Sequence, residues 1–141
     1  MARFLLMVFS SPNLGQDEDY HSWYQNQHLD DVVALDGFVG GSRYAPVEMP
    51  GVDSGNQFLA IYEIEAENCE TAMRTLAEKG SKMEISPGFD PSSVRMQLFK
   101  AIGERVTGKT DMSQASGLAL SLSPTAISVA ELLSANPLQG E

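Results

Sequence analysis

The two histidines of this chain, His21 and His28, lie seven residues apart in a segment whose pattern predicts a helix. At about 100° per residue, the two rings fall within about 20° of each other, with Tyr24 on the same face. Imidazole is the side chain best suited to proton transfer near neutral pH. We therefore predict an acid–base site with His28, deeper in the helix, as general base or acid and His21 beside it. The alternative, that both histidines are structural and hydrogen-bonded to loops, stays open.

Asp31 lies one turn beyond His28, where its carboxylate could orient the imidazole. Its neighbour Asp30 is expected to be solvated. Seven residues along a helix span about 10.5 Å, too far for both histidines to reach one metal ion. We therefore predict a site without a metal, in which Asp31 assists His28.

The candidates for substrate binding come from the same helix and from three predicted strands. Arg43 and Tyr44 are consecutive on a strand, so they point to opposite faces, and whichever faces the cavity would hold a carboxylate or donate to a carbonyl. Strand tyrosines can also be core residues, and arginines can pair with surface acids. The candidate set is Trp23, Tyr24, Arg43, Tyr44, Tyr62 and Arg95.

The elements that must position these residues alternate in a simple order. Apolar alternation and turn residues predict strands over 3–10, 38–47, 57–65 and 93–102, and helices over 17–35 and 68–82. The resulting order, β-α-β-β-α-β, is the ferredoxin-like split βαβ arrangement of the α+β class. We expect this domain to occupy residues 1–104. We expect residues 105–141 to form a partly ordered C-terminal extension, with a short helix over 127–134 and the rest extended, either mobile or packed on a partner subunit.

Composition excludes several classes of function. The 141 residues carry 19 acidic and 9 basic side chains, a net charge of −10, which disfavours nucleic acid and anionic lipid as partners. The longest apolar run, residues 4–9, is far shorter than the roughly 20 residues that span a bilayer. The one cysteine, Cys69, cannot form an internal disulfide. We expect a cytoplasmic protein.

A four-stranded sheet with helices on one face leaves its other face bare. Strand 3–10 carries apolar side chains on both faces, so the bare face would expose a large apolar area to water. We therefore expect two subunits to pair sheet to sheet as a homodimer.

Residues 21–39, HSWYQNQHLDDVVALDGFV, and the strand 58–64, FLAIYEI, resemble the EthD-like branch of the dimeric α/β-barrel superfamily. Asp30 and Asp36 stand where that family has prolines. The resemblance implies a homodimer whose two sheets close a barrel, with a cavity between sheet and helices. It also implies cofactor-free proton transfer, with His28 in the place of the family's histidine. Heme-binding relatives have a later histidine, and this chain has none after position 28.

Together these observations predict a cofactor-independent enzyme acting on a small aromatic or cyclic, carbonyl-bearing substrate. The expected reactions are those of a lyase (decarboxylation or dehydration), an isomerase or a cyclase. Two alternatives stay open: a cofactor-free monooxygenase of a phenolic substrate, and a non-catalytic dimer that binds a ligand or a partner.

Overall fold

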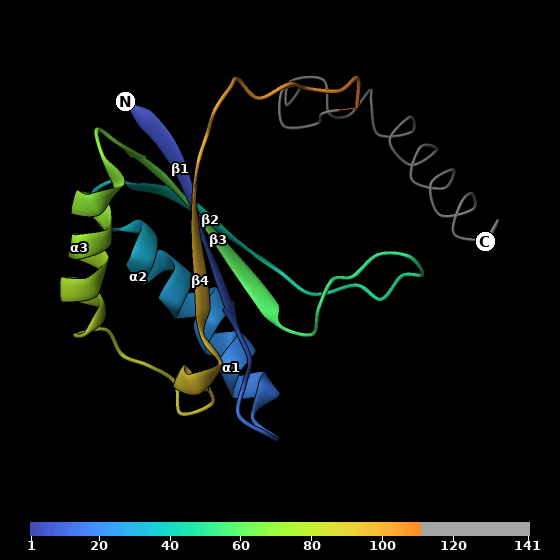
Figure 1. Ribbon diagram of the computed structural model, residues 1–141. Helices are drawn as coiled ribbons and strands as arrows, with labels where there is room; N and C mark the ends of the chain where they lie inside the picture. Colours follow the sequence, from blue (N-terminus) through green and yellow to red (C-terminus); the bar gives the residue numbers. More distant parts are fainter. Residues whose placement is uncertain (111–141) are drawn as a thin grey trace. The chain divides into compact units, whose positions relative to one another are not determined.

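The computed structural model describes residues 1–110 and shows an α+β fold with helices packed on one face of an antiparallel sheet (Figure 1). The sheet has four strands in the order β2-β3-β1-β4. The strands are β1 (Ala2–Ser10), β2 (Phe38–Tyr44), β3 (Phe58–Ala66) and β4 (Arg95–Lys100), and the helical elements are α1 (Asp17–Trp23), η1 (Tyr24–His28), α2 (Leu29–Val33), α3 (Cys69–Gly80) and η2 (Pro91–Ser93). The predicted order β-α-β-β-α-β is therefore confirmed.

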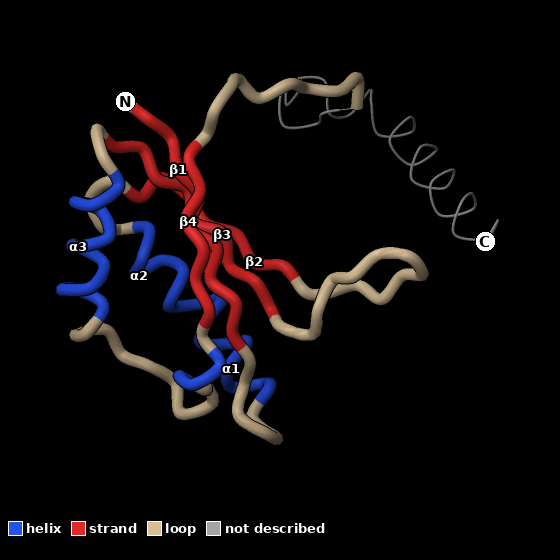
Figure 2. The backbone as a smooth tube through the Cα atoms, viewed as in Figure 1, coloured by secondary structure: helices blue, strands red, loops and turns tan. Residues whose placement is uncertain are grey.

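The chain divides into two compact units, Met1–Ile102 and Gly103–Glu141. All of these strands and helices belong to the first unit (Figure 2). The helix expected over 127–134 lies outside the described residues. Within residues 1–110, no helix is long and apolar enough to cross a membrane.

The core forms between the sheet and the helices because alternate strand residues point to the same face. On β1, Phe4, Leu6 and Ser10 are buried on the helix side, and Leu6 lies opposite Tyr62 of β3. The buried apolar residues are Phe4, Leu6, Tyr20, Trp23, Tyr24, Leu29, Val32, Phe38, Ala60, Tyr62, Ile64 and Ala72. Aromatic residues of the first helix therefore pack directly against the centre of the sheet.

The first helix contains a wide turn that its residue pattern did not predict. The segment Tyr24–His28 is π-helical, between two α-helical segments. A regular wheel places Leu29 opposite Tyr20, yet both are buried. The wide turn accommodates an extra residue, which brings Leu29 and Val32 back to the core. The helical wheel was thus wrong beyond Tyr24.

Strands β2 and β4 are shorter than predicted, and β4 ends at Lys100 rather than 102. Strand β2 ends at Tyr44 rather than 47, shortly before Pro46, which has no backbone N–H to donate to a sheet. Strand β4 begins at Arg95 rather than 93, since Pro91–Ser93 forms a short 3₁₀ turn in which Asp90 accepts from the Ser92 N–H. Helix α3 begins after Asn68, whose side chain accepts from the Thr71 N–H at 3.1 Å.

The loop before η2 packs closely against the start of the first helix. A Cβ at Gly88 would lie 2.9 Å from the Gln16 carbonyl and 3.1 Å from the Tyr20 nitrogen, so only glycine fits. This approach places Phe89 in stacked contact with the Tyr20 ring, at 6.4 Å between centroids. The loop thereby fixes the N-terminal half of the helix that carries both histidines.

The second face of the sheet carries no helix in the described unit. From the register, Leu5, Tyr44 and Phe99 point to this face, and they are 40%, 52% and 49% exposed. We call this surface the open face; its apolar side chains are Leu5, Met7, Phe9, Tyr44, Leu59, Ile61 and Phe99. All six residues of β4 are exposed.

Candidate active site

His28 lies at the end of the π-helical turn, against two aromatic rings. Its imidazole stacks on the Trp23 indole at 4.6 Å and meets the Tyr24 ring edge-on at 5.2 Å. The indole is itself fixed, because its Nε1 donates to the Glu84 carbonyl at 2.9 Å. The His28 ring is thus held by packing on a rigid platform.

The Nδ1 atom of His28 is buried and has no hydrogen-bond partner among the described residues. Burial lowers the pKa of His28, and the charge of Asp31 raises it by a smaller amount. At neutral pH the ring is therefore uncharged and can accept a proton. No hydrogen bond joins Asp31 to this ring in the described part of the chain, so Asp31 acts on it through its charge.

Three tyrosines gather on the helix side of the sheet. Tyr20 and Tyr24 come from the helix, and Tyr62 comes from β3. Tyr20 Oη shares a hydrogen bond of 2.6 Å with Ser10 Oγ. All three side chains are buried, so their hydroxyl groups have little access to water.

The Tyr62 hydroxyl is buried without a hydrogen-bond partner among the described residues. Burial raises the pKa of Tyr62 far above its usual range, and the neighbouring Tyr24 adds to that effect. Burial also raises the pKa of Tyr24, while interaction with Tyr62 lowers it. These opposite effects reflect proximity rather than a bond, because Tyr62 Oη lacks hydrogen-bond geometry. Tyr62 therefore stays protonated and can donate.

Arg43 reaches the same cluster from β2. It lies opposite Ala60, so its side chain points to the helix side of the sheet. Its guanidinium carbon is 4.7 Å from the centre of the Tyr24 ring and 5.6 Å from that of Tyr20. The sequence left open which of Arg43 and Tyr44 faces the helices. The structure places Arg43 on that side, next to the tyrosines.

A hydrogen bond from Arg43 fixes the tautomer of His21. Arg43 Nη2 donates to His21 Nδ1 at 2.8 Å, because guanidinium can only donate. Partial burial lowers the pKa of His21, the Arg43 charge lowers it further, and Asp17 opposes both. His21 is therefore neutral at physiological pH, with its proton on Nε2.

Tyr44 and Arg95 lie away from this cluster, on the open face. Arg95 covers the Phe9 ring, with its guanidinium carbon 4.0 Å from the ring centre. Tyr44 lines an apolar cavity of about 330 Å³ with Phe9, Leu59 and the loop after β2. Their side chains lie on the opposite face of the sheet from those of Tyr62 and Arg43, so the predicted binding set is divided between the two faces.

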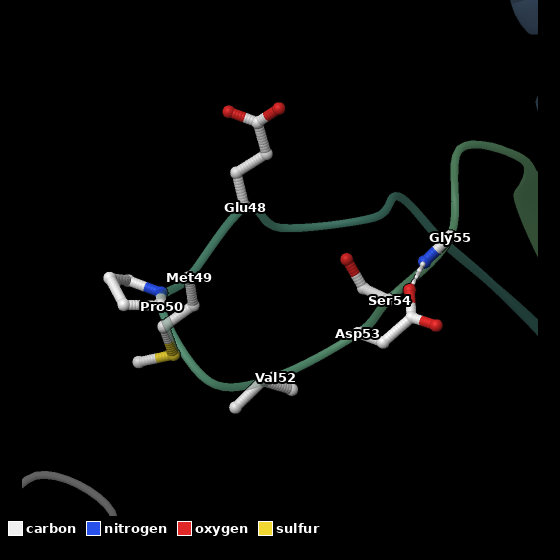
Figure 3. A pocket seen from close by; sticks show the side chains of 7 residues that line it. All are labelled: Glu48, Met49, Pro50, Val52, Asp53, Ser54 and Gly55. Atoms are coloured by element: carbon white, nitrogen blue, oxygen red, sulfur yellow. Dashed lines mark hydrogen bonds between the residues drawn. The ribbon is translucent and has the colours of Figure 1, made fainter.

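The cavities described for residues 1–110 do not coincide with the cluster. One of about 280 Å³ lies beside Trp23 and Gln27, on the side of Glu84. Another, of about 540 Å³, is formed by the loop from Glu48 to Gly55 (Figure 3). There the Asp53 carboxylate accepts from the Gly55 N–H at 3.0 Å, while Glu48 points away from it. The cavity expected between sheet and helices is not observed among these.

The described residues contain no group of three or more His, Cys, Asp or Glu side chains that could hold a metal ion.

Two residues next to the cluster were not among those predicted from the sequence. Ser10 is hydrogen-bonded to Tyr20, and Phe58 packs against the His21 ring. Their alternation with Leu6 and Ala60 on the strands was the available signal.

Comparison of the chain with protein-family models, curated proteins and solved structures finds no match. The interpretation of the site therefore depends on its own geometry.

Proposed function

We propose that this chain is a cofactor-independent enzyme that moves protons on a small aromatic or cyclic, carbonyl-bearing compound. One observation carries the proposal: two buried hydrogen-bonding atoms, His28 Nδ1 and Tyr62 Oη, have no partners among the described residues and flank the same tyrosine, Tyr24. The reaction classes that fit are a lyase, such as a decarboxylase or dehydratase, and an isomerase or cyclase.

Leaving such atoms unpaired is costly. Each buried unsatisfied group costs about 1–3 kcal/mol, and about nine in ten buried polar groups in proteins are paired. A bound substrate would supply the missing partners. Neutral His28 accepts, and the Tyr62 phenol donates to a carbonyl oxygen.

His28 and Tyr62 have complementary roles in the enolisation of the substrate. His28 takes a proton from the carbon next to the carbonyl: the C–H bond breaks, the proton moves to the imidazole, and the electron pair moves toward the carbonyl oxygen. The Tyr62 hydroxyl donates to that oxygen as its negative charge develops. The protonated His28 then returns the proton to another atom of the substrate, which completes an isomerisation. General acid–base help of this kind contributes about 10²–10⁴-fold in rate.

The proposal includes the ferredoxin-like fold and a homodimer of the dimeric α/β-barrel type, in which two open faces pack together. Support comes from the apolar side chains of the open face and from the resemblance of residues 21–39 to the EthD-like branch. A second subunit would also complete any cavity that one subunit leaves open to water. The partners proposed are thus a small-molecule substrate and a second copy of the chain.

The experiment is an NMR titration of the two imidazoles during addition of pooled cyclic keto acids, aromatic aldehydes and phenols. We expect one pool to shift the His28 signals and change its pKa, and the responsible compound to be consumed by the wild type but not by His28→Phe. If both rings keep a pKa near 6.5 and ignore every pool, the proposal is wrong. Oxygen uptake during turnover would replace it with the monooxygenase alternative.

A further inference from the structure

Arg43 is a half-buried cation without a carboxylate partner among the described residues, in a chain with ten more acidic than basic side chains. Its contacts are a hydrogen bond to neutral His21 and the faces of Tyr20 and Tyr24. With 19 acids in the sequence, an ion pair would have been an easy way to neutralise it. The charge is instead held by aromatic rings.

The geometry leaves the edge of the guanidinium available. Arginine has five N–H donors in one plane, and the bond to His21 uses one of them. The guanidinium carbon lies 4.7 Å from the centre of the Tyr24 ring, and the remaining donors make no hydrogen bond within the described residues, so they can bind another acceptor. A planar fork of this kind matches the two oxygens of a carboxylate better than any other side chain does.

The surroundings of Arg43 favour an aromatic body on the ligand. Half-buried Phe58 meets the His21 ring edge-on at 4.4 Å and lies 5.9 Å from the Tyr20 ring. The partly exposed rings of Phe58 and His21 form an aromatic wall beside the guanidinium, while the Tyr20 ring is fully buried. An aliphatic acid or inorganic phosphate would satisfy the charge but leave this wall without a partner.

We infer that Arg43 anchors the carboxylate of an aromatic acid, whose ring packs against the partly exposed rings of Phe58 and His21. The inference rests on the proposed function, since it names the substrate class of the same site: an aromatic carboxylic acid, held at Arg43 and processed at His28 and Tyr62. A carboxylate seated there would also carry charge next to His21, which makes the His21 ring a reporter of occupancy.

The test compares matched ligands on the full-length chain. Affinities for benzoate, salicylate, benzamide, acetate and inorganic phosphate are measured by calorimetry, with the His21 NMR signals as a second readout. We expect the two aromatic acids to bind at least tenfold more tightly than benzamide, acetate or phosphate, and to shift His21. Equal binding of benzamide would overturn the inference, and so would equal binding of acetate or phosphate.

Variants locate the site. Arg43→Gln should lose the tenfold preference for benzoate over benzamide, and Arg43→Lys should keep part of it. Arg74→Gln removes a charge from the exposed face of α3 and should change nothing. Arg95→Gln removes a strand arginine whose guanidinium lies over the Phe9 ring, on the open face. Loss of binding in Arg95→Gln, with binding retained in Arg43→Gln, would contradict the inference. The comparison of ligands on the wild type does not depend on whether a variant folds.

The outcomes separate this inference from the proposed function. Benzoate binding through Arg43, with no response of His28 to any ligand and no turnover, would keep the carboxylate site and reject the enzyme. Turnover of a neutral carbonyl compound that is unaffected by Arg43→Gln would keep the enzyme and reject the carboxylate site.

Discussion

At the residue scale, Tyr62 carries an unpaired hydroxyl whose removal should relieve the fold. Tyr62→Phe deletes a buried group without a partner among the described residues, so we expect the free energy of unfolding to stay equal or rise by about 1 kcal/mol. The same change should lower turnover, because the donor to the substrate is lost. Urea unfolding and a rate assay measure the two effects.

Tyr20→Phe is the matched control. It breaks the 2.6 Å bond to Ser10 and leaves that buried hydroxyl short of a partner, so it should destabilise the chain by about 1–3 kcal/mol. Equal destabilisation by both changes would show that Tyr62 is bonded in solution.

His28 should make stability depend on pH in a definite direction. Its pKa in the folded chain lies below the value of about 6.5 in the unfolded chain, so protonation favours unfolding. The contribution of His28 is constant above about pH 6.5, and stability is lost as the pH falls from there toward the folded pKa. His28→Phe, which keeps an aromatic ring on Trp23, should weaken this loss in urea unfolding measured between pH 7.5 and 5. A slope unchanged by His28→Phe would contradict the burial of the ring.

Asp31→Asn tests the carboxylate's effect on the same ring. Since the charge of Asp31 raises the pKa of His28, its removal should lower that pKa further in an NMR titration. His21, which responds to Arg43 and Asp17, is the internal control and should keep its pKa. An unchanged His28 would show that Asp31 has no influence on it.

At the element scale, the π-helical turn decides which side chains reach the core. Deleting Asn26, an exposed residue of that turn, would turn it into a regular α-helical turn and keep Leu29 and Val32 on the core side, whereas inserting an alanine after Asn26 would rotate the C-terminal part of the helix by about 100° relative to its N-terminal part. After the insertion, either Tyr20 and Tyr24 or Leu29 and Val32 would leave the core. We expect the insertion to cost several kcal/mol by thermal unfolding, whereas Asn26→Ala should change stability by less than about 0.5 kcal/mol. Near-equal stability of the insertion variant would contradict the role of the turn in setting the phase of the helix.

Most helices and strands could be predicted from the sequence, but the face of the sheet or helix on which each side chain lies could not. Alternation along β2 required Arg43 and Tyr44 to face apart; only pairing with β3, where Ala60 is buried and Leu59 faces the open side, decides between them. The wide turn at Tyr24–His28 was not predictable, because its residues fit an ordinary helix and tertiary packing selects the extra residue. The proximity of Tyr24 and Tyr62 likewise depends on packing between distant segments.

At the scale of the whole molecule, the open face determines the expected oligomeric state. Light scattering after gel filtration should give twice the mass of the 15.3 kDa chain. Phe99→Glu puts a charge opposite Leu5 on that face and should halve the measured mass, since burying an unpaired charge in an interface is costly. Leu14→Glu, at a fully exposed turn, should leave the mass unchanged. A wild type that stays monomeric at every concentration would rule the homodimer out.

The stacking of His28 on the chain's one tryptophan, Trp23, makes the protein its own optical sensor. Indole emission is quenched by a protonated imidazole in van der Waals contact and little affected by a neutral one. Fluorescence should therefore fall as the solution is acidified through the transition of His28 and recover when the ring is neutral again. Any compound that binds His28 should shift that transition, so a library could be screened on unlabelled wild-type protein before a substrate is known.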